Sequence, residues 1–159
     1  MKQEELCNES TLVFKRTYNT TPQRLFKVWT DASLMSQWFR PNERWLKVEV
    51  ESDPVPGGQQ LIVMTHQDGD VYRTRGRYLE VSEPEKVVFT WIWEESPDGP
   101  EESKITLTFL PVSGGTQMTL VHENLTSEQA KQGTEAGWTG CLESLDKFLE
   151  KSELQGGVI

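Results

Sequence analysis

Residues 126–151, with the sequence TSEQAKQGTEAGWTGCLESLDKFLEK, decide the fold. Their apolar side chains recur at steps of three and four residues, which is the period of one stripe along a helix. Thr126 and Gln129 have the spacing of a capping box at the helix start. The stripe consists of Trp138, Cys141, Leu142, Leu145, Phe148 and Leu149. We therefore predict one long amphipathic helix that follows the rest of the domain.

The two halves of this helix differ in side-chain volume. The second half is bulky, whereas Gly133 and Gly137 stand in the first half where large side chains would be expected. Gly140 is a third glycine, and each glycine in a helix interior costs about 1 kcal/mol relative to alanine. We expect the glycines to make room, with the helix packed tightly at one end and standing over a cavity at the other.

The chain before the helix contains seven stretches with strand character, at residues 11–18, 45–51, 59–66, 71–81, 87–93, 105–109 and 118–122. Apolar and polar residues alternate in these stretches, which is the period of a half-buried strand. In the second stretch, for example, Leu46, Val48 and Val50 are expected to share one face. Thr21-Pro22 and Asp31 predict the starts of two short helices after the first strand.

Short turns join most of the strands, including the PDGP sequence at residues 97–100, so consecutive strands are expected to be antiparallel neighbours. Such a sheet needs a cover on its apolar face, and the long helix is the element available for it. The sequence therefore predicts an α+β fold in which a curved antiparallel sheet wraps around the C-terminal helix. Residues 11–151 are expected to form one domain, with a flexible tail at 1–10 and a second tail at 152–159.

The composition limits the classes of partner. A formal net charge of −9 argues against nucleic acid and against an anionic membrane, because phosphate groups require a basic face. Residues 1–10 have no apolar run like that of a secretory signal, and no stretch approaches about 18 apolar residues. We expect a cytoplasmic protein in which Cys7 and Cys141 are reduced, with no metal or cofactor.

Several local strings, spread over residues 11–150, resemble a known family. They are Pro22, Trp29-Thr30-Asp31, Trp38 and Pro41; Pro56-Gly57-Gly58; Gly76-Arg77-Tyr78-Leu79-Glu80; Pro84 with Phe89-Thr90-Trp91; Thr119-Leu120-Val121-His122-Glu123; and Gly137-Trp138 with Leu142 and Leu145. The combination is similar to the START-like (birch-pollen-allergen, SRPBCC) superfamily, and within it to homologs of the activator of heat-shock-protein-90 ATPase. The resemblance implies a helix-grip fold whose hydrophobic cavity takes apolar molecules, and it implies a chaperone as a second kind of partner.

Candidate ligand-binding residues lie on the side of the strands that is expected to face the helix. Aromatic and apolar side chains with a few polar tips are typical of a small-molecule site, and the same pattern fits residues that simply pack as core. The candidates are Gln60, Ile62, Met64, His66, Tyr72, Thr74, Tyr78, Phe89, Trp91, Trp93 and His122 on the strands, with Gly133, Gly137 and Trp138 on the helix.

His66 and His122 are the two histidines of the sequence. Such a pair could act as acid and base, but no zinc-ligand pattern accompanies it, and a polar handle in the cavity or a hydrogen-bonded core histidine is favoured. Arg73, Arg75 and Arg77 alternate on one strand face, either as a partner patch or as a solvated outer face.

Three functions follow from these features. A protein that binds an apolar, aromatic or acyl small molecule in the cavity is favoured. The first alternative is an enzyme of the cyclase or hydratase kind, in which a cavity histidine or tyrosine moves protons; no catalytic residue is assigned to it. The second alternative is a chaperone cofactor that acts through its surface.

Overall fold

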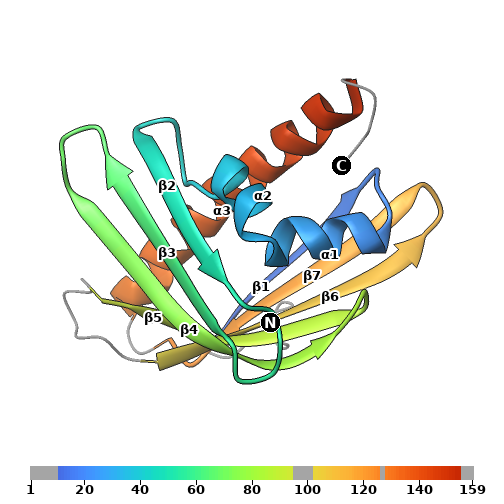
Figure 1. Cartoon of the computed structure of the whole chain (residues 1–159), viewed down its shortest axis with the longest axis horizontal. Coiled ribbons are helices and arrows are strands. Elements are labelled where there is room, and N and C mark those ends of the chain that lie inside the picture. Colours follow the sequence, from blue (N-terminus) through green and yellow to red (C-terminus); the bar gives the residue numbers. More distant parts are fainter. Residues whose placement is uncertain (1–10, 95–101, 126–127, 155–159) are drawn as a thin grey trace.

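A single antiparallel sheet of seven strands carries the fold (Figure 1). The computed structural model describes residues 11–94, 102–125 and 128–154. The strands are β1 (Leu12–Tyr18), β2 (Trp45–Ser52), β3 (Gln59–His66), β4 (Val71–Ser82), β5 (Lys86–Trp93), β6 (Glu102–Val112) and β7 (Gly115–Glu123). The helices are α1 (Pro22–Thr30), α2 (Ala32–Trp38) and α3 (Glu128–Leu154). The strand order is β1-β7-β6-β5-β4-β3-β2, so β1 and β2 form the two edges.

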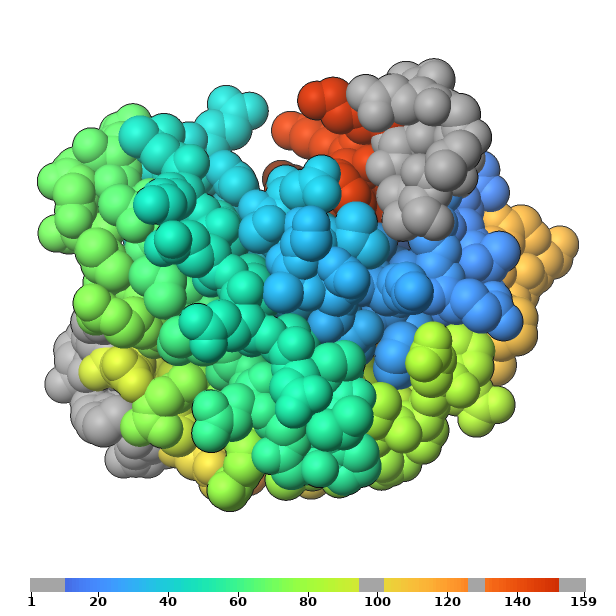
Figure 2. All heavy atoms as spheres, viewed as in Figure 1, coloured from blue at the N-terminus to red at the C-terminus, as the bar shows by residue number. Residues whose placement is uncertain are grey.

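The sheet curls around its apolar side, and α3 packs across it (Figure 1). Helices α1 and α2 lead from one edge strand to the other, and their blue atoms fill much of the face seen in Figure 2. This arrangement confirms the predicted α+β helix-grip fold, including the two short helices directly after the first strand.

Helix α3 ends at Leu154, three residues beyond the Lys151 at which the expected domain ends. None of the helices within the described ranges carries an apolar run long enough to cross a membrane. The expected tail at 1–10, the turn at 97–100, the capping box at Thr126 and the end of the expected C-terminal tail lie outside the described residues.

Both short helices begin where the sequence predicts. The Thr21 hydroxyl oxygen accepts a hydrogen bond from the Arg24 amide at 3.2 Å, and Pro22 takes the first helical position. Asp31 accepts from the Leu34 amide at 3.0 Å and starts α2. Each side chain satisfies one of the free amides at a helix N-terminus, which confirms the two expected N-caps.

Tryptophans join the helices to one another. The rings of Trp29 and Trp38 meet edge to face at 4.8 Å, and both side chains are buried. The Trp38 indole N–H donates to the Val28 carbonyl at 2.9 Å, which satisfies a polar atom that would be costly to bury alone. The Ser144 hydroxyl donates to the Trp38 carbonyl at 2.6 Å and so ties the second half of α3 to α2.

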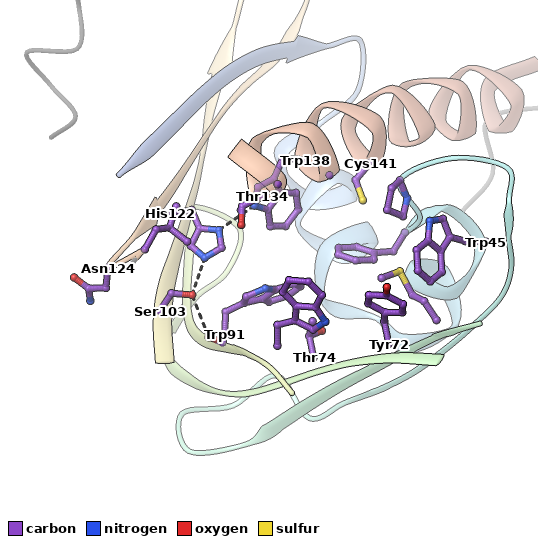
Figure 3. Close-up of a pocket in the computed structure, with 17 residues that line it drawn as sticks. Trp45, Tyr72, Thr74, Trp91, Ser103, His122, Asn124, Thr134, Trp138 and Cys141 are labelled. Atoms are coloured by element: carbon purple, nitrogen blue, oxygen red, sulfur yellow. Dashed lines mark hydrogen bonds between the residues drawn. The ribbon is translucent and has the colours of Figure 1, made fainter. Parts of the chain in front are cut away.

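Strand β2 departs from the predicted alternation at its start. The register with β3 shifts between Trp45 and Lys47, as in a β-bulge, and Leu46 is 64% exposed. The prediction that Leu46 shares a face with Val48 was therefore wrong. One extra residue in a strand turns the side chains before it to the opposite face, and Trp45 points inward in place of Leu46 (Figure 3).

The three glycines of α3 have two different roles. A Cβ placed on Gly140 would lie 1.9 Å from the carbonyl oxygen of Pro41, so the helix backbone touches the segment after α2 at this point. A Cβ on Gly133 or Gly137 would meet no atom within 4 Å. Room explains Gly133 and Gly137, as predicted, whereas close packing explains Gly140.

We expect Gly140→Ala to lower the free energy of unfolding by about 1–3 kcal/mol, because the added methyl group forces backbone against backbone. Gly133→Ala is the matched control and should raise it by about 0.5–1 kcal/mol through helix propensity. Urea unfolding of both variants measures the difference. Equal stabilities for the two variants would contradict the close contact at Gly140.

Candidate functional site

A cavity of about 360 Å³ lies between the first half of α3 and the concave side of the sheet (Figure 3). Its size falls in the range of pockets that take small molecules. No charged side chain lines it among the described residues. The lining consists of Phe39, Pro41, Trp45, Met64, Tyr72, Thr74, Trp91, Trp93, Ser103, His122, Asn124, Leu125, Gly133, Thr134, Gly137, Trp138 and Cys141.

The side of the cavity formed by α3 combines small residues with one large ring. Gly133 and Gly137 leave open space, and Trp138 beside them is buried. Cys141 follows one helical turn after Gly137, and burial raises the pKa of its thiol. The thiol therefore stays protonated at neutral pH and contributes apolar surface to the cavity wall.

Aromatic rings form the opposite walls. At one end, Tyr72 stacks on Trp93 with ring centres 5.6 Å apart and planes 19° apart, and Trp45 meets Tyr72 edge to face at 5.0 Å. Near the other end, Trp91 lies 5.7 Å from Trp138. Rings that pack on one another lose few rotamers when a ligand binds, so the walls are largely preformed.

A buried polar cluster closes the end of the cavity near His122 (Figure 3). The indole N–H of Trp138 donates to His122 Nδ1 at 3.0 Å. Ser103 Oγ lies 2.7 Å from His122 Nε2 and 3.1 Å from the carbonyl oxygen of Trp91. Strands β6 and β7 place Ser103 and His122 side by side, and α3 supplies Trp138.

These contacts assign the proton positions in the cluster. Because Nδ1 of His122 accepts from Trp138, the proton of a neutral imidazole is on Nε2 and is donated to Ser103 Oγ. The Ser103 hydroxyl then donates to the Trp91 carbonyl. Burial lowers the pKa of His122 from 6.5 to about 4, so the ring is neutral at physiological pH. Neither ring nitrogen has a lone pair available to take a proton from a substrate.

The sequence candidates divide into two groups. The structure brings Met64, Tyr72, Thr74, Trp91, Trp93, His122, Gly133, Gly137 and Trp138 together around the cavity. It places Gln60, Ile62, His66, Tyr78 and Phe89 outside the lining. Ile62 and Phe89 are fully buried core residues, at 0% and 1% exposure.

Gln60 and Tyr78 belong to a separate polar cluster in the core. The Gln60 amide donates to the Tyr78 hydroxyl at 3.1 Å, and the Tyr78 hydroxyl lies 2.7 Å from Ser52 Oγ. The Ser52 hydroxyl in turn donates to the Thr30 carbonyl at the end of α1. These side chains satisfy one another and connect the sheet to the helices, which differs from their expected position beside a ligand.

His66 lies at the end of β3 and is not part of the cavity lining. Its Nδ1 is 3.0 Å from a carboxylate oxygen of Asp68, and its ring packs edge to face on Trp45 at 4.8 Å. Trp45, which is paired with His66 across β2 and β3, lines the cavity instead. The two histidines are not brought together as an acid–base pair.

Several lining residues were absent from the sequence prediction: Phe39, Pro41, Trp45, Ser103, Asn124, Leu125, Thr134 and Cys141. Two of them carry a usable signal, since Ser103 continues the inward alternation of Ile105 and Cys141 lies on the predicted helix stripe. Phe39 and Pro41 lie between α2 and β2, where no period applies.

The fold and the cavity define a protein of the START-like helix-grip class. The family model described as "Activator of Hsp90 ATPase homolog 1-like protein" matches residues 19–150, and the chain belongs to this family. The resemblance seen in the sequence is thereby confirmed.

Solved structures share the fold over almost their whole length. The AHSA1 protein of Silicibacter pomeroyi is 27% identical, with a TM-score of 0.79 and coverage of 90% of this chain and 99% of that one. A Rhodobacter sphaeroides protein is 23% identical, with a TM-score of 0.77 and coverage of 91% and 94%. A Nitrosomonas europaea protein is 23% identical, with a TM-score of 0.76 and coverage of 92% and 97%. Among curated protein sequences, none matches this chain significantly.

The buried neutral His122 predicts a loss of stability in mild acid. In the unfolded chain the His122 imidazole has a pKa of 6.5, whereas in the folded protein its pKa is about 4. The stabilising contribution is therefore complete above pH 6.5 and is lost as the pH falls towards 4. Between pH 7 and pH 5 we expect the free energy of unfolding to fall by about 2 kcal/mol through this residue.

Urea unfolding at several pH values measures the slope, which should disappear in His122→Gln and persist in the control His66→Gln. NMR of the imidazole nitrogens tests the proton position directly. A His122 ring that titrates near pH 6.5, or that carries its proton on Nδ1, would contradict the arrangement.

Proposed function

We propose that this protein binds an apolar small molecule, aromatic or acyl, in the cavity beneath α3. The observation that carries the proposal is a preformed space of about 360 Å³ with an aromatic lining and no charged side chain among the described residues. Transfer of apolar surface from water into such a space is favourable by roughly 25 cal/mol per Å². The volume is near the lower end of the usual range, which favours a compact ring system or a short acyl chain.

The contact surfaces for such a ligand come from both sides of the cavity. Trp91 and the stacked pair of Tyr72 and Trp93 supply flat ring surface from the sheet. Gly133 and Gly137 leave the opposite side open. Helix glycines that meet no neighbouring atom have a stability cost without a packing gain, and a binding role accounts for them.

An enzyme of the cyclase or hydratase kind has less support. Both ring nitrogens of His122 are engaged by neighbouring side chains, and His66 is outside the lining. A proton-moving role would then rest on Tyr72, which lines the cavity.

The chaperone hypothesis depends on the outer surface. Arg73, Arg75 and Arg77 are exposed on β4, as expected for the outer face of the sheet. Arg75 forms an ion pair with Glu94. The family description connects the chain to activators of Hsp90 ATPase by name only. The cavity is a more specific observation, and it favours small-molecule binding.

Filling the cavity tests the proposal. We expect Gly137→Leu to place a side chain in the open space and to abolish the binding of tetralin, an uncharged bicyclic hydrocarbon, which the natural protein should bind saturably. Titration followed by protein amide chemical shifts measures the binding. Thr139→Leu, which adds the same side chain at an exposed position of α3, should leave it unchanged.

Native mass spectrometry of the protein purified from its own host would identify the class of the natural ligand. The expected result is a defined extra mass that is released on denaturation and is missing from Gly137→Leu. Tetralin binding that persists in Gly137→Leu would show that the cavity is not the binding site.

A further inference from the structure

Two buried polar atoms of the cavity wall have no hydrogen-bond partner among the residues that the structure describes. They are the hydroxyl oxygen of Thr74 and the indole nitrogen of Trp93. The Thr74 side chain is well buried, since the residue is only 6% exposed. A buried polar atom without a partner costs about 1–3 kcal/mol, so its retention at a site calls for a reason.

Strand pairing places these two side chains next to each other. Thr74 on β4 is directly opposite Trp93 on β5, and both belong to the cavity lining. Side chains in directly opposite positions have Cβ atoms about 4.5–5.5 Å apart. Tyr72 stacks on the Trp93 ring at 5.6 Å and helps to hold its orientation. The pair therefore forms a small polar spot beside the aromatic rings of this wall.

The polar cluster around His122 has its hydrogen bonds satisfied within the protein. His122, Ser103 and Trp138 hydrogen-bond to one another and to a backbone carbonyl. Other unpartnered buried atoms in the described residues, such as the Tyr18 hydroxyl and the Trp29 indole nitrogen, belong to side chains outside the lining. Within the described lining, the Thr74 hydroxyl and the Trp93 indole nitrogen are thus the side-chain polar atoms that are both buried and unpartnered.

The hydrogen-bonding properties of Thr74 and Trp93 specify which ligand group fits beside them. The Trp93 indole N–H can only donate, whereas the Thr74 hydroxyl can donate and accept. A carbonyl oxygen has two lone pairs and can accept from both, and a hydroxyl can accept from Trp93 while it donates to Thr74. A carboxylate would be buried without a countercharge, because no charged side chain lines the cavity among the described residues and His122 is neutral.

We propose that the ligand is uncharged and carries one carbonyl or hydroxyl oxygen on its apolar body, and that Thr74 and Trp93 hold this oxygen. The ligand class is thus a cyclic or short-chain ketone, ester or alcohol rather than a fatty acid or a pure hydrocarbon. This inference rests on the proposed function, since it assigns the polar contact of the same cavity.

Three probes of matched shape test it: tetralin, tetralone, in which a carbonyl replaces one CH2 group, and a tetralin carboxylate. Dissociation constants come from amide chemical shifts in the natural protein and in Thr74→Val and Trp93→Phe. Thr74→Val removes the polar atom and keeps the side-chain shape, whereas Trp93→Phe removes the indole N–H together with part of the ring. Each should weaken tetralone roughly 3- to 10-fold relative to tetralin in the same variant.

A spectroscopic signature locates the contact. The indole N–H signal that disappears in Trp93→Phe belongs to Trp93, and it should shift further with tetralone than with tetralin. Thermal unfolding of the variants confirms that they remain folded.

Each outcome decides a separate point. If tetralin and tetralone bind saturably and neither substitution changes their affinities, the assigned role of Thr74 and Trp93 is wrong and the proposed function stands. Binding of neither probe would overturn both. A carboxylate that binds more tightly than tetralone would overturn the uncharged ligand. Selective weakening of tetralone in both variants, with the shifted Trp93 signal, supports the assignment.

Discussion

The position of α3 over the sheet depends on one backbone contact. At Gly140 the helix lies against the carbonyl of Pro41, at a distance that leaves no space for a side chain. One turn further along, Ser144 hydrogen-bonds to the carbonyl at the end of α2. The second half of α3 is thereby held down on the core, while the first half, at Gly133 and Gly137, spans open space. The cavity is the geometric consequence of fixing the helix at one end.

The interior polar groups have two different kinds of arrangement. In the core, Gln60, Tyr78 and Ser52 satisfy one another, and in the cavity wall His122 and Ser103 do so with Trp138. Satisfied groups of this type add rigidity and specify one packing, because any displacement leaves a donor or acceptor unpaired. Such groups maintain the shape of the cavity and have few free hydrogen-bond donors or acceptors for another molecule. In the described lining, the buried polar atoms left without a partner are the Thr74 hydroxyl and the Trp93 indole nitrogen.

The order and type of the elements followed from the sequence because they depend on local signals. Strand periodicity, the N-caps at Thr21 and Asp31 and the stripe on α3 each reflect chemistry within a few residues. The site was harder to predict because it depends on contacts between distant segments. A bulge in β2 exchanged Leu46 for Trp45, and nothing in the local pattern marks it. Tyr78 has the right alternation for the cavity, yet Ser52 and Gln60 engage it in the core.

The pairing of the first strand with the last has a consequence for the order of events during synthesis. Leu12 on β1 lies opposite His122 on β7, so more than a hundred residues separate the two partners. Contacts of such long range form late, because the intervening chain must first be ordered. During synthesis on a ribosome, β1 could pair with β7 only after β7 has emerged, and α3 would emerge after that. The cavity would therefore be complete only on a finished chain.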